Sequence, residues 1–148
     1  MSVVSRRNVI FASITLLFGC RGNRVPYRKP TSKVTGRLVI DGDEPGSQVK
    51  IDCVPISEVD TDPAHFSVSS TMTQPDGSFE ISTYQSGDGV PDGDYVLTIT
   101  WGTLNLMSRS YGGPDKLKGR YSDPKKSEIK FTVEGSPVDL GDIELTTK

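Results

Sequence analysis

Histidine and cysteine are scarce in this chain of 148 residues, which contains one histidine and two cysteines. Catalytic triads and imidazole-rich metal sites need more such side chains, and the motifs H-E-x-x-H, C-x-x-C and G-x-S-x-G do not occur. Two cysteines also cannot form the disulfide framework of a small secreted domain. The net charge of −2 lacks the basic surplus of nucleic-acid binders. We therefore expect no catalytic residue, metal, cofactor or nucleic-acid partner.

The N-terminus has the pattern of an export signal. Residues 1–19 contain no acid, and Arg6 and Arg7 precede an apolar run over residues 9–18. A charged start followed by a short apolar stretch and a small residue is typical of a secretory signal peptide. The run is about half as long as a membrane-spanning helix requires. Export through the general secretory route or the twin-arginine route both fit the two arginines.

The end of this segment, Leu17-Phe18-Gly19-Cys20, resembles the bacterial lipobox. The family has a small residue where this chain has Phe18. The resemblance implies cleavage between Gly19 and Cys20, a diacylglycerol on the Cys20 sulfur and a further acyl chain such as palmitate on the new amine. Two or three acyl chains would anchor the protein stably, because one chain alone binds membranes only marginally. The alternative is an ordinary signal peptide in which Cys20 has no special role.

Residues 21–32 are basic, contain two prolines and lack hydrophobic periodicity. This composition predicts a flexible tether over residues 20–32, between the lipid on Cys20 and a domain over 33–148. From residue 33 onward, apolar residues alternate with polar ones, which is the pattern of half-buried strands. No window of twelve residues carries a helical stripe. The alternating runs predict about seven strands over residues 34–40, 48–53, 68–72, 79–81, 95–101, 129–133 and 138–145.

Turn signals separate these runs, and they favour an antiparallel, all-β sandwich. Asp41-Gly42, Pro75-Asp76-Gly77 and Pro91-Asp92-Gly93 have the composition of tight turns. In the last run the apolar residues change parity, and a β-bulge at Gly141-Asp142 would turn both halves inward. The residues expected in the core are Phe79, Tyr95, Leu97, Ile99, Phe131 and Val133.

Two of the turns carry family-like motifs. Gln74-Pro75-Asp76-Gly77-Ser78-Phe79 and Gly89-Val90-Pro91-Asp92-Gly93-Asp94-Tyr95 resemble the signatures of carboxypeptidase regulatory-like domains. The resemblance implies a prealbumin-like (transthyretin-like) fold in which Phe79 and Tyr95 each begin a strand and fill the core. Together with Gly87-Asp88-Gly89 and residues 113–124, the layout also resembles small planctomycete-type lipoproteins of unknown function. Neither resemblance implies an activity, because a fold does not fix a function.

The remaining candidates for chemistry are few. His65 lies in an expected loop, and Cys53 occupies an inward strand position typical of a small buried hydrophobe. Acidic residues gather in two turns and could supply oxygen ligands to calcium, although Asp beside Gly is also what tight turns prefer. These acids are Asp41, Asp43 and Glu44 in one turn, and Asp88, Asp92 and Asp94 in the other.

The connection over residues 102–126 is expected to lack strand structure and is long for a small domain, which favours a functional role. It carries six bases against two acids, in contrast to the negative net charge of the chain. Aromatic residues stand among these bases. The candidate partner-binding residues are Tyr111, Lys116, Lys118, Arg120 and Tyr121. The alternative is a solvated crossover loop, or tyrosines that fold back onto the sandwich.

The sequence therefore predicts a non-enzymatic protein of the cell envelope, held by lipid at the outer membrane or the periplasmic face. Its expected partners are the membrane and an envelope protein or a glycan, and the oligomeric state stays open. Two other functions stay open as well. One is a carrier of a small ligand, and the other is a metal-dependent enzyme that uses the acidic turns.

Overall fold

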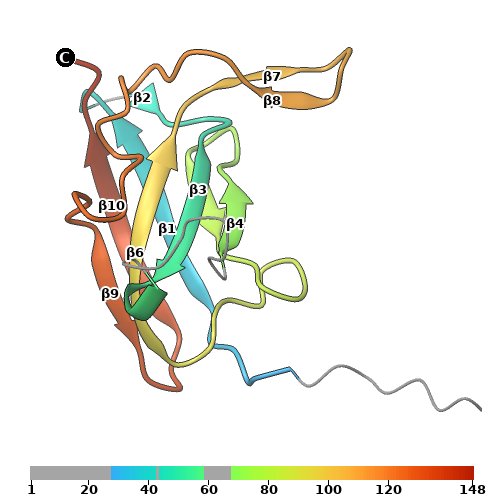
Figure 1. Cartoon of the computed structure of the whole chain (residues 1–148), viewed down its shortest axis with the longest axis vertical. Coiled ribbons are helices and arrows are strands. Elements are labelled where there is room, and N and C mark those ends of the chain that lie inside the picture. The colour runs from blue at the N-terminus through green and yellow to red at the C-terminus, as the bar shows by residue number, and fades with distance from the viewer. Residues whose placement is uncertain (1–27, 43, 59–67) are drawn as a thin grey trace, which may run out of the picture.

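The computed structural model describes residues 28–42, 44–58 and 68–148, and in this part of the chain the fold is a β-sandwich with no α-helix (Figure 1). The first sheet has the order β10 (Val138–Leu145), β1 (Val34–Ile40), β2 (Glu44–Pro45), and β5 (Ser78–Glu80) also pairs with β1. The second sheet has the order β4 (Ser69–Met72), β3 (Lys50–Pro55), β6 (Gly93–Thr100), β9 (Lys130–Val133). A short 3-10 helix, η1 (Ile56–Glu58), follows β3. The expected all-β sandwich is confirmed.

A third, two-stranded sheet is formed by β7 (Thr103–Asn105) and β8 (Ser110–Gly112). The blue N-terminal segment joins the sandwich at one end, and the orange β7–β8 hairpin projects from the opposite end (Figure 1). The prediction that residues 102–126 lack strand structure is therefore wrong. Leu104 and Tyr111 face each other across the hairpin, but three-residue strands are too short to produce a readable alternation.

Alternating apolar residues of the two sheets meet in one core, as the period-two pattern predicts. Phe79 and Leu97 are 2% and 0% exposed, and the ring of Tyr95, which is 7% exposed, stacks on Phe131 with centroids 5.7 Å apart. Of the six residues expected in the core, five are buried and Phe131 is half-buried at its edge. The fully described core comprises Val34, Leu38, Ile40, Val49, Ile51, Cys53, Phe79, Ile81, Val90, Tyr95, Leu97, Ile99, Leu117, Val133 and Leu145.

The central strand β6 differs from the half-buried strand that its alternation predicts. Val96 and Thr98 point away from the core, yet they are 0% and 6% exposed. β6 pairs with β3 and β9 along its two edges, and it also contacts η1. Alternation identified the inward face correctly and gave no information on what would cover the outer one.

Strand β4 faces the other way from the sequence-based expectation. Val68 and Met72 were predicted to alternate inward, but they are 38% and 40% exposed, whereas Ser69 is buried. The register explains this, because Thr71 lies opposite the buried Ile51 and must share its face. Pairing with β3 outweighs the weak hydrophobic signal of a four-residue strand.

The first and last strands pair in parallel, which corrects the expectation of a purely antiparallel sandwich. The pairing runs from Val34 opposite Val138 to Ile40 opposite Leu145, and it skips one residue of β10 near Gly141. Gly141 has φ 64°, a left-handed conformation that favours glycine. The predicted bulge is confirmed, and it turns Leu140 and Ile143 toward the core in spite of their different parity.

Gly36 allows a close contact between two strands of the first sheet. A Cβ on Gly36 would lie 2.7 Å from Cζ of Phe79 on the neighbouring strand β5. The absence of a side chain there lets the ring of Phe79 lie flat under β1 and fill the core. The glycine between the apolar residues of β1 is therefore a packing requirement.

Truncation of Phe79 tests this core. Phe79→Ala should lower the free energy of unfolding by about 3–5 kcal/mol, because the ring is almost wholly buried. Phe131→Ala should cost clearly less, because its ring is half-buried at the edge of the core. Urea denaturation of both variants measures the difference, and an equal or larger loss for Phe131→Ala would contradict this packing.

Candidate functional site

The predictions of a signal peptide and a lipid anchor concern residues that lie outside the described part of the chain. The signal peptide over 1–19, the cleavage site between Gly19 and Cys20, and lipidation of Cys20 stay predictions, as does the loop position of His65. The described part of the predicted tether, residues 28–32, contacts the domain. Ser32 and Val90 exchange backbone hydrogen bonds of 2.9 and 3.1 Å, and the guanidinium of Arg28 lies 5.4 Å from the ring centroid of Tyr84.

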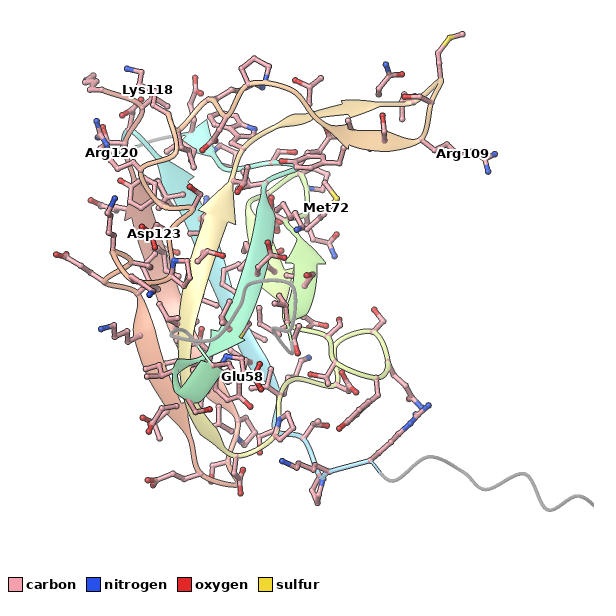
Figure 2. All side chains as sticks on the ribbon, viewed as in Figure 1. Glu58, Met72, Arg109, Lys118, Arg120 and Asp123 are labelled. Atoms are coloured by element: carbon pink, nitrogen blue, oxygen red, sulfur yellow. The ribbon has the colours of Figure 1, made fainter. Side chains whose placement is uncertain are left out.

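The two ends of the sandwich therefore differ. We call the end at which residues 28–33 join the domain the entry end. We call the β7–β8 hairpin together with residues 113–121 the distal end. Figure 2 places Arg109 on the hairpin at one side of this end, and Lys118 and Arg120 on a loop at the other side of the same end.

The distal end is built onto the edge of β6. The amides of Leu97 and Ile99 donate to the carbonyls of Ile129 and Tyr121, each at 2.9 Å. The next outward amide, that of Trp101, donates to Oδ1 of Asp115 at 2.9 Å. The connection thus continues the line of β9 along β6 and satisfies its backbone donors. It is a fixed part of the sheet edge, not a solvated crossover.

Asp115 holds this connection in place with its carboxylate. Besides the Trp101 amide, Oδ1 accepts the amide of Leu117 at 3.0 Å, and Oδ2 accepts the amide of Gly119 at 2.8 Å. The turn directs Leu117 into the core, where it is 0% exposed. In the sequence, Asp115 was readable only as one of two acids in residues 102–126. Its role in holding the turn was missed, although aspartate commonly forms Asx-type turns in loops.

The five candidate partner-binding residues lie at the distal end in two different roles. The hydroxyl of Tyr111 accepts the amide of Gly102 at 2.7 Å and lies 3.0 Å from the carbonyls of Gln48 and Thr100. The hydroxyl of Tyr121 accepts the amide of Thr146 at 3.1 Å, and its ring packs against the core. Both tyrosines therefore tie the connection to the sandwich.

The three basic candidates remain at the surface. Nζ of Lys116 lies 4.5 Å from the ring centroid of Trp101, where the cation and the indole attract each other. Lys118 and Arg120 are exposed on the turn that follows. Binding of a partner by any of the five stays a prediction. The structure leaves the three basic side chains exposed, whereas the two tyrosines hold the connection to the sandwich.

Two residues of the distal end escaped sequence analysis. Leu106 and Met107 form the tip of the hairpin and are 79% and 96% exposed. Asn105 precedes them and turns the chain, and this Asn followed by an apolar pair was the available signal. It was missed because residues 102–126 showed no strand pattern on either side.

The acidic turns proposed for calcium use their carboxylates to hold backbone and hydroxyl groups. Asp88 accepts the amides of Thr83, Tyr84 and Gln85 at 2.8–3.0 Å. Partial burial acts to raise the pKa of Asp88, but these donors outweigh it, so the pKa lies below its usual value. Asp92 accepts the amide of Gly135, and Asp94 accepts the hydroxyl of Thr132.

Asp41 plays the same part at the other turn, where it accepts the hydroxyls of Thr146 and Thr147. Asp43 lies outside the described residues. Among the residues that the structure describes, no three His, Cys, Asp or Glu side chains converge on one point. In the same part of the chain, no helix is long and apolar enough to cross a membrane.

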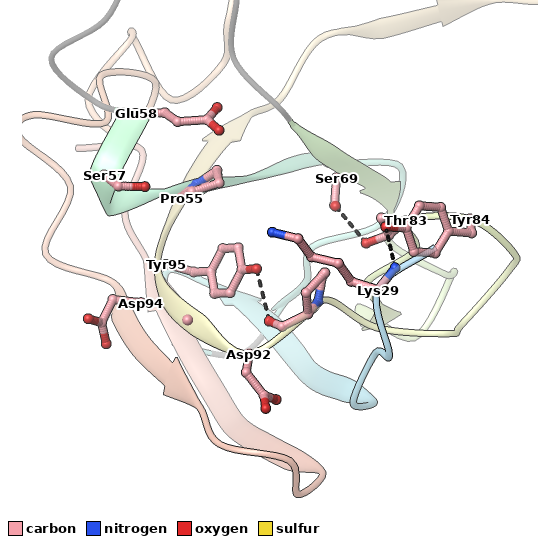
Figure 3. A pocket seen from close by; sticks show the side chains of 12 residues that line it. Lys29, Pro55, Ser57, Glu58, Ser69, Thr83, Tyr84, Asp92, Asp94 and Tyr95 are labelled. Carbon is pink, nitrogen blue, oxygen red and sulfur yellow. Dashed lines mark hydrogen bonds between the residues drawn. The ribbon is translucent and has the colours of Figure 1, made fainter. Parts of the chain in front are cut away.

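A cleft of about 360 Å³ opens at the entry end (Figure 3). Lys29 extends across it from one side, and Asp92 and Asp94 lie on the other. On its wall, Ser69 donates to Thr83 at 2.7 Å, and Thr83 in turn donates to the carbonyl of Gly89. The surface of the cleft is part polar and part apolar, and Tyr84 and Tyr95 contribute aromatic surface.

Among the described residues, burial is the main cause of the two most strongly raised pKa values. Burial raises the pKa of the Cys53 thiol to about 12, and the thiol is wholly inside the core. Burial, with a smaller effect of Cys53, raises the pKa of Tyr95 to about 12, and its hydroxyl donates to the carbonyl of Pro91 at 2.9 Å. Cys53 is thus the buried hydrophobe that its position predicted.

No family model matches this sequence, and no curated protein matches it. Solved bacterial all-β domains are similar in architecture. The major pilin subunit of Bacillus cereus shares 10% identity at a TM-score of 0.44, over 78% of this chain and 30% of that chain. A proposed carbohydrate-binding protein from Pseudomonas aeruginosa shares 14% sequence identity at a TM-score of 0.43, over 81% of this chain and 90% of that chain. A DUF3823 family protein from Parabacteroides merdae shares 16% sequence identity at a TM-score of 0.39, over 80% of this chain and 46% of that chain. This chain thus spans less than half the length of the pilin and the DUF3823 protein.

Removal of the Asp115 carboxylate tests how the distal end is held. Asp115→Ala leaves three backbone amides without their acceptor and should lower the free energy of unfolding by about 1–3 kcal/mol. The matched control is Asp142→Ala, because Asp142 makes only an exposed ion pair with Arg37 at 3.8 Å and should cost less than about 0.5 kcal/mol. Equal effects of the two substitutions in thermal denaturation would contradict the role of Asp115.

The hydrogen bonds of Asp41 predict a pH dependence. Those from the hydroxyls of Thr147 and Thr146 hold the pKa of Asp41 below its usual value. The pKa is lower in the folded state, so this contribution to stability is present above the unfolded pKa of about 4 and is lost as the pH falls through the folded one. Thr147→Val should raise the pKa of Asp41 in a carboxyl-carbon NMR titration, whereas Thr132→Val should not. An unchanged pKa would show that these bonds do not form in solution.

Proposed function

We propose that this protein is a non-enzymatic module of the cell envelope, anchored by lipid on Cys20, which binds or scaffolds an envelope component through its distal end. One observation carries the proposal. The chain joins the sandwich at the entry end, and the basic candidate residues and the projecting hairpin lie at the opposite end (Figures 1 and 2). A domain tethered to a membrane by its N-terminus presents its opposite end to other components.

The roles of the polar groups support a binding role without catalysis. The carboxylates of Asp41, Asp88 and Asp115 accept hydrogen bonds that shape turns, and the Cys53 thiol is enclosed in the core. Groups that are committed to holding the backbone are poorly available as acids, bases or nucleophiles. The distal end, in contrast, holds four bases against one acid within residues 103–121.

A second function, the carriage of a small ligand, is favoured by the cleft at the entry end. Its volume of about 360 Å³ is within the range of small-molecule sites. The hydroxyls of Ser69 and Tyr95 and the charges of Lys29 and Asp94 would suit a polar, hydroxylated ligand. Lys29→Ala would weaken uptake of such a ligand, and binding by the distal end would not change.

Intact mass of the protein from cell envelopes tests the anchor. We expect a chain that begins at Cys20 and carries the added mass of acyl groups, and we expect Cys20→Ser to leave the membrane fraction. The matched control is Cys53→Ala, which removes the other thiol and should leave the protein in the membrane fraction. An unmodified Cys20, or a mature chain that begins elsewhere, would overturn the anchored assignment.

A further inference from the structure

The tip of the β7–β8 hairpin exposes more apolar surface than any other described part of the chain. Leu106 and Met107 are 79% and 96% exposed, whereas the other exposed large hydrophobic side chains are only 38–40% exposed. Single exposed hydrophobic residues are common on protein surfaces, but two adjacent ones at a projecting tip are not explained by packing. They are therefore candidates for contact with another surface.

Hydrogen bonds within the loop shape the tip. Oδ1 of Asn105 accepts the amides of Met107 and Ser108 at 3.0 and 3.2 Å, and the hydroxyls of Ser108 and Ser110 lie 2.7 Å apart. Arg109 has φ 51° and completes the turn. Contacts that shape a loop before it docks reduce the conformational entropy lost on docking.

The base of the hairpin is fixed to the second sheet. Tyr111 bonds to Gly102 and reaches the carbonyls of Gln48 and Thr100. Gly102 is buried, and a Cβ there would lie 2.8 Å from the carbonyl oxygen of Gly112. The hairpin therefore projects in a defined direction from the sandwich.

The distal end carries more bases than acids. Residues 103–114 contain Arg109 and no acid, and Lys116, Lys118 and Arg120 follow in the sequence. Figure 2 shows Arg109 on the hairpin at one side of this end and Lys118 and Arg120 at the other side. The single acid of this region, Asp115, is surrounded by three amide donors. At the entry end, acids and bases occur together: Glu58, Asp92 and Asp94 line the cleft with Lys29, and Arg28 and Lys33 lie at the same end.

We propose that the distal end docks on an anionic lipid surface, with Leu106 and Met107 inserted at the boundary of headgroups and acyl chains. The basic side chains then face the lipid phosphates. An apolar tip that carries Arg109 and shares its end of the molecule with Lys118 and Arg120 suits this partner, because a flat lipid surface can contact the whole end. Burial of the apolar side chains and attraction to anionic headgroups then add together. Fluid lipid also accepts a projecting pair without a matching pocket.

This inference rests on the proposed function in one respect, the choice of the distal end as the binding end. It adds a second lipid contact at the end opposite the one on Cys20. The protein would then hold lipid at both ends and could link two membrane surfaces.

A fluorescent probe at the tip tests the inference separately from the anchor. Met107→Cys in the full-length protein can be labelled with an environment-sensitive dye, because Cys53 is buried and Cys20 is either acylated or replaced by serine. With vesicles of phosphatidylcholine and phosphatidylglycerol, we expect a blue shift of the dye. With phosphatidylcholine alone, we expect binding at least about tenfold weaker, and 0.5 M salt should reduce the shift.

Two variants serve as controls. The same dye at Met72→Cys, an exposed methionine on β4, should not shift, because it lies away from the tip (Figure 2). Lys118→Glu combined with Arg120→Glu should weaken the response of the tip probe to anionic vesicles. Emission of the single tryptophan, Trp101, checks that each variant is folded.

Three results would overturn the inference. One is a silent tip probe with anionic vesicles. Another is a dye shift with neutral vesicles as large as that with anionic vesicles, together with no effect of the Lys118→Glu and Arg120→Glu substitutions on the shift. The third is a shift without lipid that rises with protein concentration and accompanies a dimer in sedimentation, which would make the tip a contact between protein copies. None of these results bears on the intact mass of the protein from cell envelopes, so lipidation of Cys20 is tested independently.

Discussion

Satisfaction of the backbone donors along one edge of β6 is the constraint on which the rest of the structure depends. β6 is buried on both faces, and a buried amide without an acceptor is costly. β9 pairs with the first half of β6, from Gly93 to Val96. The amides of Leu97, Ile99 and Trp101 find their acceptors on the following connection, in Ile129, Tyr121 and Asp115. The connection is long because it must return along this edge.

The same constraint determines where function can reside. Tyr121 and Leu117 fix the connection to the core, so the hairpin before it and the basic turn within it are held at one end of the sandwich. The parallel pairing of β1 and β10 closes the first sheet. Acidic side chains then fasten the turns, and Asp41 links the first turn to Thr146 and Thr147. The binding role that we propose for the distal end rests on this arrangement.

Much of this fold could be predicted from the sequence. Alternation located the seven principal strands and nearly all of the expected core, because every second residue of a strand faces the core. The change of parity in the last run located the bulge at Gly141. The orientation of β4, the outer cover of β6 and the parallel pairing of β1 depend on partners distant in sequence, which alternation does not encode. Within the candidate site, the charges of Lys118 and Arg120 were readable. The alternative that the tyrosines fold back onto the sandwich was also readable. The particular partners of Tyr111, Tyr121 and Asp115 were not, because Gln48, Thr146 and Trp101 are distant in the sequence.

Native-state hydrogen exchange tests the central claim most directly, namely that residues 113–129 are part of the edge of β6. The amides of Leu97, Ile99 and Trp101 should exchange only on global or near-global unfolding, as slowly as amides between β3 and β6. The exposed amides of the hairpin tip should exchange much faster. Rapid exchange at Ile99 and Trp101, with slow exchange retained between β3 and β6, would mean that the connection is a detached loop and would contradict a preformed distal end.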